Sequence, residues 1–382
     1  MTATAPKRIM TRAAMSTQGV VLASLTIIIV GLGLIMVGSA SAVDSYQATA
    51  NAASGLVDQA LFAGLGLVGM FVASRLPISL YRRSAMVYLY FWLALQLATV
   101  LFGVEINGNR NWLDLGITRI QPSEFLKLAL ILALAHLLSQ LGSSKEQNRG
   151  IWTTVFFYSG ISLVLVVLMG KDMGTGVVIA LFLMGMYLFA GMRVFTWLFM
   201  MSMGVIAALG LIWLSPSRRV RFEAWLFPES ADPMGVRWQY EHGTWALASG
   251  GIFGTGLGRS KLKWNWIPEV ENDFIFAVIG EELGLLGAMV TIVLFFAMGI
   301  TLFSIAKSQT NAFSRNIVIG VMLWIVLQAF VNIGVVLGLF PVLGVPLPLI
   351  SKGGSSLIST MAAVGVVLAV ERDRIVHLGR TR

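Results

Sequence analysis

Residues 20–37 read VVLASLTIIIVGLGLIMV, eighteen consecutive positions without a charged side chain. A run of this length is typical of a transmembrane helix, because about 20 apolar residues cross the hydrocarbon of a bilayer. Further apolar runs follow along the chain, at 57–75, 85–103, 124–142, 151–169, 173–191, 195–214, 283–306, 316–337 and 354–370. These runs are too long for barrel strands, and lipid cannot satisfy an exposed strand edge. We therefore predict an all-α polytopic membrane protein with ten transmembrane helices, the first over 18–41.

The composition supports this class of protein. The chain has 382 residues, of which 57% are apolar and 12% are charged, and its mean hydropathy is +0.82. Soluble domains hold roughly 25% charged residues, so a cytosolic enzyme, a disordered protein and a nucleic-acid-binding protein are excluded despite the net charge of +9. The lack of cysteine excludes disulfides, thiolate metal sites and a cysteine nucleophile. The three histidines are too scattered to predict a zinc site.

The distribution of Lys and Arg predicts the orientation. With the N-terminus inside, the inner segments hold 15 of these residues and the short outer loops hold 4. These outer loops cover 43–56, 104–123, 170–172 and 338–353. Basic residues accumulate on the cytoplasmic side of membrane proteins. We therefore expect both termini in the cytoplasm, with an N-terminal segment 1–17, one membrane domain 18–370 and a C-terminal tail 371–382.

The first apolar run also has features of a secretory signal. Basic residues precede it, and Ala40-Ser41-Ala42 imitates a cleavage site after it. The run is longer than the apolar core of a typical signal, and cleavage would leave nine spans with the termini on opposite faces. We therefore expect this helix to remain as an uncleaved anchor.

The largest outer loop, 215–272, separates the seventh and eighth predicted helices. It contains five Trp residues and a Gly-rich stretch at 250–258. Loops of this length are usually functional or disordered, and this density of aromatic residues favours an ordered segment at the membrane interface. The Gly-rich stretch lacks the ending of a Walker motif. Two interpretations stay open: a tightly turning loop, and a backbone surface near an anionic ligand, assisted by Arg259, Lys261 and Lys263.

Three acidic residues lie near the start of the eighth apolar run. Asp273 opens the apolar stretch that leads into this run at 283, and Glu281 and Glu282 lie about two helical turns inside that stretch. A carboxylate at membrane depth is costly, so it faces protein or water and is a functional candidate. The alternatives are structural: Asp273 as a helix N-cap, and Glu281 and Glu282 as members of an ion pair or a cap.

Several stretches, in order along the chain, carry a family resemblance. They are GNRNWLDLG at 108–116 with IQPSEFLKL at 120–128, DMGTG at 172–176, IPEVENDFIFAVIGEELG at 267–284, and NIGV at 332–335 with LPLISKGGSS at 347–356. They resemble motifs of the SEDS family (shape, elongation, division and sporulation), whose members include FtsW and RodA. The resemblance covers nearly the whole chain and agrees with ten spans. The run KWNWIP at 263–268 slightly favours the FtsW-like division proteins.

The resemblance implies a peptidoglycan glycosyltransferase that polymerises lipid II, an undecaprenyl-pyrophosphate disaccharide peptide, for septal or cell-wall synthesis. The reaction would take place on the outer face of the bacterial cytoplasmic membrane. The family's catalytic aspartate falls on Asp273, which is expected to act as general base in an inverting displacement of undecaprenyl pyrophosphate. A lipid II flippase and a non-catalytic division scaffold are the alternatives. A transporter is disfavoured, because no matched pair of broken helices recurs in two halves of the chain.

The candidate substrate-binding residues accompany the catalytic Asp273. They are Arg110, Glu124, Lys127, Asp172, Arg219, Lys261, Lys263 and Ser351. Glu124 and Lys127 are spaced i, i+3 on one helix face, so they form either an ion pair or a polar wall of the substrate cavity. Asp172 is either a structural cap or a residue of the substrate site.

The same resemblance implies the partners. Lipid II, membrane lipid and a class B penicillin-binding protein transpeptidase are expected, and no nucleic acid. No cofactor is assigned, although a divalent cation such as Mg²⁺ or Mn²⁺ would assist departure of the pyrophosphate.

At three places the sequence departs from the family pattern. Lys171 stands where the family usually has Pro, and Lys352 stands where it usually has Tyr. The run Glu271-Asn272-Asp273 replaces the common His-Thr-Asp, and the aspartate is retained. Each extra lysine either binds the pyrophosphate or pairs with a nearby acid.

Overall fold

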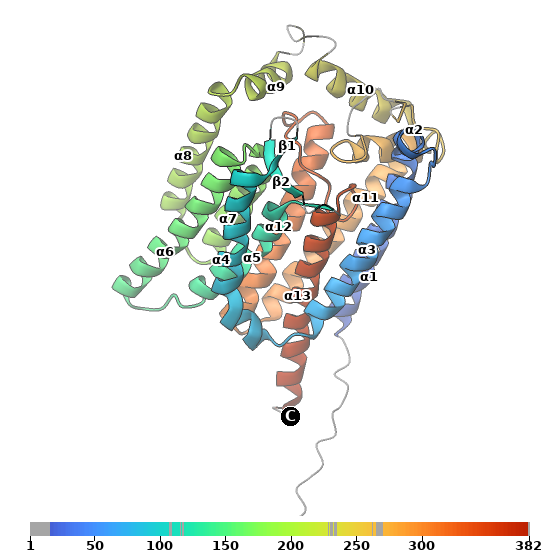
Figure 1. Ribbon diagram of the computed structural model, residues 1–382. Coiled ribbons are helices and arrows are strands. Elements are labelled where there is room, and N and C mark those ends of the chain that lie inside the picture. The colour runs from blue at the N-terminus through green and yellow to red at the C-terminus, as the bar shows by residue number, and fades with distance from the viewer. Residues whose placement is uncertain are drawn as a thin grey trace, which may run out of the picture.

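The computed structural model describes residues 16–106, 109–114, 116, 118–227, 229, 232, 235–261, 263–264 and 270–380. Residues 1–15 of the predicted N-terminal segment lie outside these ranges, as do residues 265–268 of the KWNWIP run. Within them the chain forms a bundle of long helices, capped at one end by shorter helices and strands (Figure 1). We call this end of the molecule the capping layer.

Ten helices of the described chain correspond to the ten predicted spans. They are α1 (Thr17–Ala40), α3 (Ser54–Arg75), α4 (Ile78–Phe102), α5 (Pro122–Leu138), α6 (Lys145–Leu163, continued by the π-helical turn η1, Val164–Met169), α7 (Met173–Phe189), α8 (Val194–Trp213), α11 (Ile275–Ser308), α12 (Ala312–Val336) and α13 (Gly354–Arg380). Eight are long and apolar enough to cross a membrane, whereas α5 and α7 have 17 residues each. The predicted class, a polytopic helical membrane protein, is confirmed.

Two helix boundaries differ from the predicted spans. Helix α11 begins at Ile275 rather than at 283, and its first turns, which contain Glu281 and Glu282, are separated by a break at Gly284 from the part that matches the predicted span. Helix α13 continues to Arg380 rather than ending at 370. Charged side chains end the apolar run there, but Glu371 forms an ion pair with Arg374 along the continuing helix.

The core of the bundle surrounds α5. Fourteen of its 17 residues are buried, and Pro122 occupies its first turn, where a missing backbone N–H costs nothing. Helices α3 and α13 pack closely, since a Cβ atom on Gly365 would lie 2.4 Å from the carbonyl oxygen of Met70. Helix α8 is the opposite case: it lies at the periphery (Figure 1), and none of its residues is buried within the described chain.

The capping layer is formed by segments that the sequence predicts as outer loops. It contains the helices α2 (Ala42–Thr49), α9 (Pro216–Leu226) and α10 (Val236–Ser249) and the strands β1 (Val104–Ile106), β2 (Asn109–Asp114) and β3 (Arg119–Ile120). The strands form an antiparallel sheet in the order β1-β2-β3, with Val104 opposite Trp112 and Leu113 opposite Ile120. The described parts of 215–272 include the helices α9 and α10, as expected for an ordered segment, whereas the short strands are a feature that the sequence did not predict.

The Gly-rich stretch forms a tight loop against a break in α11. The break lies at Gly284, whose φ of 70° is left-handed. The amide of Thr255 donates to the Glu281 carbonyl at 2.9 Å, and the amide of Gly256 donates to the Glu282 carbonyl at 3.1 Å. Gly254 approaches so closely that its Cβ would lie 2.1 Å from the Glu282 carbonyl oxygen. The interpretation as a tightly turning loop fits these contacts.

Glu281 and Glu282 are both 1% exposed, and their carboxylates accept hydrogen bonds under this loop. Ser39 Oγ donates to Glu282 at 2.7 Å, and the amide of Ser260 donates to it at 3.1 Å. The amide of Lys261 donates to Glu281 at 2.9 Å. These contacts support the structural interpretation, in which the two acids anchor the Gly-rich loop.

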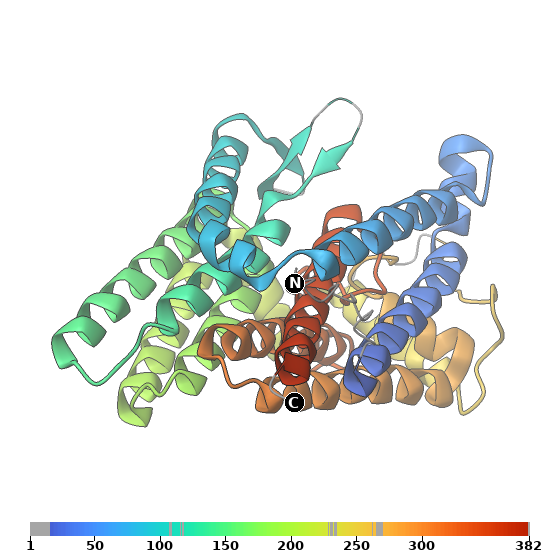
Figure 2. The same cartoon turned by 90° about the horizontal axis from the view of Figure 1, so that it is seen from below.

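The start of α1 and the end of α13 lie at the end of the bundle opposite the capping layer (Figure 1). Seen from that end, α13 lies near the middle of the bundle, between the blue helices α1 and α3 and the green helices α6 to α8 (Figure 2). This arrangement agrees with an even number of crossings. The assignment of this end to the cytoplasm remains a prediction from the distribution of Lys and Arg.

Candidate active site

A cavity of about 1480 Å³ opens at the end of the bundle that carries the capping layer. Among the described residues, its wall holds seven acidic and five basic side chains. They are Asp58, Glu105, Asp114, Glu124, Asp172, Glu271 and Asp273, with Arg119, Lys171, Arg218, Arg221 and Lys352. Acids therefore outnumber bases here, although the whole chain has a net charge of +9. The cavity suits a large polar ligand whose anionic groups meet a few particular cations.

Asp273 lies on this wall, in the turn that precedes α11. Its backbone carbonyl accepts a hydrogen bond of 2.9 Å from Asn332 Nδ2. Its carboxylate faces the loop at 341–346, because a Cβ atom on Gly344 would lie 3.6 Å from Asp273 Oδ2. The N-cap position of α11 is Phe274 rather than Asp273. Asp273 is therefore not the N-cap residue of α11, and its catalytic role stays a prediction.

Ser351 lies next to Asp273 but serves the backbone. Its Oγ donates to the Asn272 carbonyl at 2.6 Å and accepts from the Leu347 amide at 2.8 Å. Ser351 is 5% exposed and is not among the residues that line the cavity. Ser351 therefore does not line the cavity itself. It is connected to the cavity only through the Asn272 segment, which its hydroxyl group holds.

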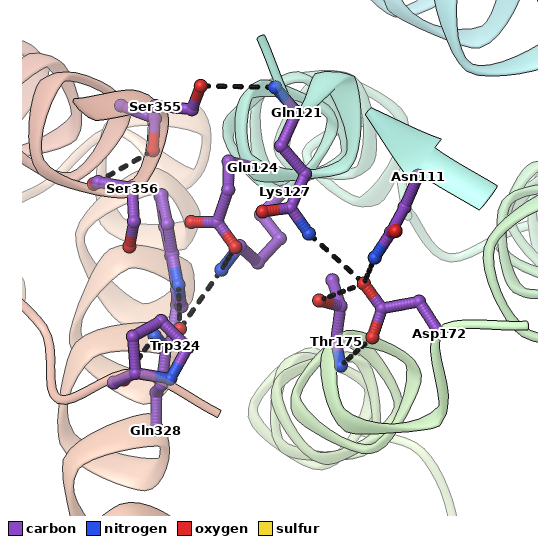
Figure 3. Close-up of polar contacts among 12 residues, drawn as sticks. Asn111, Gln121, Glu124, Lys127, Asp172, Thr175, Trp324, Gln328, Ser355 and Ser356 are labelled. Atoms are coloured by element: carbon purple, nitrogen blue, oxygen red, sulfur yellow. Dashed lines mark hydrogen bonds and ion pairs between the residues drawn. The ribbon is translucent and has the colours of Figure 1, made fainter. Parts of the chain in front are cut away.

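Glu124 and Lys127 form a buried ion pair. Lys127 Nζ lies 2.8 Å from Glu124 Oε1, and the two side chains are 1% and 2% exposed, respectively. The ammonium also donates to Gln328 Oε1 at 3.0 Å and lies 4.8 Å from the centre of the Trp324 ring (Figure 3). Glu124 lines the cavity, and its buried Oε2 has no hydrogen-bond partner within the described chain. Both interpretations of this pair therefore apply to Glu124.

The Glu124–Lys127 pair is connected to the loop that faces Asp273. Gln328, which accepts from Lys127, donates through Nε2 to the Pro346 carbonyl at 2.9 Å. A buried polar path thus runs from α5 across α12 to the loop at 341–346. The sequence offered the i, i+3 spacing of the pair, but not its connection through Gln328.

Asp172 is both a helix cap and part of the cavity wall. Its Oδ1 accepts from the Thr175 amide at 2.9 Å, at the N-terminus of α7. Its Oδ2 accepts from Thr175 Oγ1 at 2.8 Å, from Asn111 Nδ2 at 2.8 Å and from Gln121 Nε2 at 3.1 Å (Figure 3). One carboxylate thereby joins β2, the start of α5 and α7. Its neighbour Lys171 lines the cavity with a left-handed φ of 60°.

Four predicted cations lie outside the lining of the cavity. Arg110 lies 3.8 Å from Glu105, and Arg219 lies 2.7 Å from Glu223 with its guanidinium over the ring of Trp213. The side chain of Lys261 is exposed. The ammonium of Lys263 donates to the Gly258 carbonyl inside the Gly-rich loop.

Other cations, close to Arg219 in the sequence, line the cavity instead of these four. Arg218 and Arg221 on α9 line the cavity, and Arg218 also donates to the Lys171 carbonyl at 3.0 Å. Residues spaced i, i+3 share a helix face, so the two arginines face the cavity and Arg219 does not. The start of this helix at Pro216 was the signal in the sequence that would have indicated this phase.

A divalent cation would need several donors close together. Within the described chain, no group of three or more His, Cys, Asp or Glu residues is arranged to hold a metal ion. The acidic residues of the cavity wall therefore do not fit a preformed metal centre.

Known proteins resemble the chain over nearly its full length. The family model for FtsW, RodA and SpoVE, described as cell cycle protein, matches residues 20–375. Stage V sporulation protein E of Bacillus subtilis is 36% identical over 354 residues, which cover 91% of this chain and 95% of that protein. "Probable peptidoglycan glycosyltransferase FtsW" of Mycobacterium tuberculosis is 36% identical over 343 residues, which cover 89% of this chain and 65% of that protein.

A solved structure shares the fold. It is described as "Structural coordination of polymerization and crosslinking by a peptidoglycan synthase complex". One of its chains is 29% identical to this one with a TM-score of 0.76, and the likeness covers 92% of this chain and 97% of that chain. With ten matching spans and a family match from 20 to 375, the chain belongs to the FtsW/RodA/SpoVE family of cell cycle proteins.

Proposed function

We propose that the protein is a peptidoglycan glycosyltransferase that polymerises lipid II into glycan strands. Its family and the names of its relatives support this activity. The observation that carries the proposal is the position of Asp273 on the wall of the large polar cavity. A general base must border the space that the reacting hydroxyl enters, and Asp273 meets this requirement.

In the proposed reaction, Asp273 accepts the proton of the acceptor's 4-hydroxyl as that oxygen attacks the anomeric carbon of the donor. The bond between this carbon and the pyrophosphate oxygen breaks, and its electron pair leaves with undecaprenyl pyrophosphate. A single displacement inverts the anomeric centre and needs no enzyme nucleophile. Base catalysis of this kind contributes about 10²- to 10⁴-fold.

The leaving pyrophosphate requires positive charge. Arg218, Arg221 and Lys171 lie together around the junction of η1, α7 and α9, and all three line the cavity. Arginine suits bidentate contact with phosphate oxygens, and cations placed at the developing charge stabilise the transition state. We assign the pyrophosphate to this group of cations, in place of the Arg110, Arg219, Lys261 and Lys263 that the sequence suggested.

The lipid part of the substrate requires an apolar surface beside these cations. The C-terminal end of α8 provides one, with Leu211 and Ile212 of its last turn and the following Leu214 on the cavity wall. Because α8 buries none of its residues in the described chain, its other faces are available to the bilayer. The polyprenyl chain would therefore enter along α8, with its pyrophosphate at Arg218.

The proposal includes the side of the membrane and the partner. The excess of Lys and Arg at the end opposite the capping layer supports an active site on the outer face of the cytoplasmic membrane. The structural neighbour is a chain of a peptidoglycan synthase complex that coordinates polymerization and crosslinking. This description supports a class B penicillin-binding protein transpeptidase as the partner, which would crosslink the strands that this protein makes.

The test is polymerisation of labelled lipid II by purified protein, with and without the transpeptidase, using Asp273→Asn. Asparagine keeps the size of the side chain but cannot act as a carboxylate base, so strand synthesis is expected to fall by about 10²- to 10⁴-fold. Binding of lipid II, measured on the same preparation, is expected to change little. Glu146→Gln, an exposed acid-to-amide change at the other end of the bundle, is the matched control.

The competing functions predict other results. A flippase needs no base at this position, so lipid II translocation would continue in Asp273→Asn. A scaffold would show no polymerisation in the unsubstituted protein even with its transpeptidase present. Unchanged polymerisation by a well-folded Asp273→Asn protein would refute the catalytic assignment.

A further inference from the structure

Successive carbonyl oxygens next to Asp273 are held by one short loop. The backbone amide of Lys352 donates to the Glu271 carbonyl at 2.9 Å. Ser351 Oγ donates to the Asn272 carbonyl at 2.6 Å. The loop therefore fixes the backbone that immediately precedes Asp273, and a shift of the loop would move this segment as well.

The same loop is joined to the segment by charge. Lys352 Nζ lies 3.2 Å from Glu271 Oε1, and the two side chains are 35% and 10% exposed, respectively. Both residues line the cavity. Glu271 Oε2 is buried and has no hydrogen-bond partner within the described chain, where Lys352 is the ion-pair partner of this carboxylate. Both residues also stand where the sequence departs from the family pattern.

A third charged residue responds to this pair. Burial raises the pKa of Asp44 on α2 above its ordinary value, the Glu271 carboxylate raises it further, and the Lys352 ammonium lowers it. The two members of the pair thus act in opposite directions on the same neighbour. Without Lys352, the carboxylates of Asp44 and Glu271 would lose the ammonium that offsets their mutual repulsion.

We propose that Glu271 and Lys352 form a positioning pair that holds Asp273 in its working place, and that Lys352 acts through Glu271 rather than on the pyrophosphate. The inference rests on the proposed polymerase activity and deepens it. Removing the lysine alone leaves a buried carboxylate unpaired, which disturbs its surroundings more than removing both charges does. The lysine and the glutamate are therefore functionally coupled, although they are 81 positions apart in the sequence.

A phosphate-binding lysine would behave differently. Its ammonium would contact the substrate directly, so its loss would weaken substrate binding whether or not Glu271 was present. A positioning lysine affects the reaction step, and the effect of its loss depends on whether the glutamate is present. The two roles are separated by measuring kcat and KM for each variant, because only interactions made in the transition state change kcat.

The experiment is a double-mutant cycle in the lipid II polymerisation assay with the full-length protein and its transpeptidase. It compares the unsubstituted protein with Lys352→Met, Glu271→Gln and the double variant. Lys307→Met, an exposed lysine at the opposite end of α11, is the control. Thermal unfolding of each protein is measured in parallel, and kcat is expressed per folded molecule.

We expect Lys352→Met to lower kcat by about 10- to 100-fold with little change in KM, and the double variant to recover a large part of this loss. Contacting residues show coupling that corresponds to about 2- to 150-fold. Additive losses with a raised KM in Lys352→Met would overturn the proposal in favour of phosphate binding. A lowered unfolding temperature with unchanged kcat per folded molecule would also overturn it, because the pair would then be merely structural.

A charge-exchange variant tests the pairing if Lys352→Met does not fold. The variant Glu271→Lys/Lys352→Glu is expected to be more active than either Glu271→Lys or Lys352→Glu alone, since it restores opposite charges. Equal or lower activity of the exchanged variant would refute the pairing. An inactive unsubstituted protein would instead refute the polymerase activity itself, so the two failures are distinguishable.

Discussion

The side-chain amide of Asn332 lies 2.9 Å from the carbonyl oxygen of Asp273, and it donates a second hydrogen bond to the Val345 carbonyl at 2.7 Å. Asn332 is 1% exposed and lies on α12, about one turn after Gln328, which donates to Pro346. Helix α12 thus holds both the Asp273 segment and the loop opposite it from one buried surface.

Asn332→Leu tests this attachment. The leucine fills a similar space but leaves the carbonyls of Asp273 and Val345 without their donor. Each buried group left unsatisfied costs about 1–3 kcal/mol, so we expect a lower free energy of unfolding and a lower kcat for polymerisation. Denaturant unfolding and the lipid II assay check the two effects. Loss of stability with an unchanged kcat would show that the attachment does not position Asp273.

The buried pair of Glu124 and Lys127 gives a second prediction. Removal of one partner leaves an uncompensated charge in the bundle, which costs about 3–5 kcal/mol. Glu124→Ala and Lys127→Ala are each expected to reduce the amount of folded protein and its activity. The double variant is expected to be less harmful than the sum of the two changes. Strictly additive effects in thermal unfolding would contradict the pairing.

The helical phase of α9 predicts which arginines bind the pyrophosphate. Arg218→Met and Arg221→Met are each expected to raise KM for lipid II by roughly 10-fold, as for the loss of one charge-assisted contact of about 1.5 kcal/mol. Arg219→Met removes the same charge from the same helix, but this side chain lies outside the cavity lining and is expected to change KM much less. Titration of lipid II in the polymerisation assay measures all three. An equal effect of Arg219→Met would place the substrate elsewhere.

Reporter fusions test the orientation. A fusion after Arg382 or within 143–150 is expected to report the cytoplasm, and one inserted at 229–232 is expected to report the outside, because the excess of Lys and Arg marks the inner face. Activity of a paired cytoplasmic and extracytoplasmic reporter is the measurement. An extracytoplasmic C-terminus would contradict the even number of crossings.

The spans could be predicted from the sequence because length and hydropathy are local properties. The start of α11 could not, since Glu281 and Glu282 lie in its first turns, before the break at Gly284 and outside the predicted span. Their carboxylates are satisfied by Ser39 and by Ser260 and Lys261 of the Gly-rich loop. Whether a buried acid is tolerated depends on donors from other parts of the chain, and no local pattern reports them.

Part of the candidate site could also be predicted from local patterns in the sequence. Asp273, Glu124 and Asp172 line the cavity as expected, because an acid next to an apolar run needs a polar surface. Which of the arginines at 218, 219 and 221 face the cavity depends on the exact start of a short amphipathic helix. Sequence patterns locate such a start poorly. The contact between Glu271 and Lys352 depends on the way in which two distant loops meet in the fold.

The close packing of Gly365 against Met70 and the exposed course of α8 give the two sides of the cavity different stiffness. Sliding α13 along α3 would force backbone into backbone, whereas displacing α8 sacrifices little buried apolar contact. We expect the molecule to yield on the α8 side when a long lipid tail arrives or departs. Ser351 and Asn332 hold the backbone at Asn272 and Asp273, so in the proposed polymerisation we expect the Asp273 carboxylate to keep its place while α8 moves.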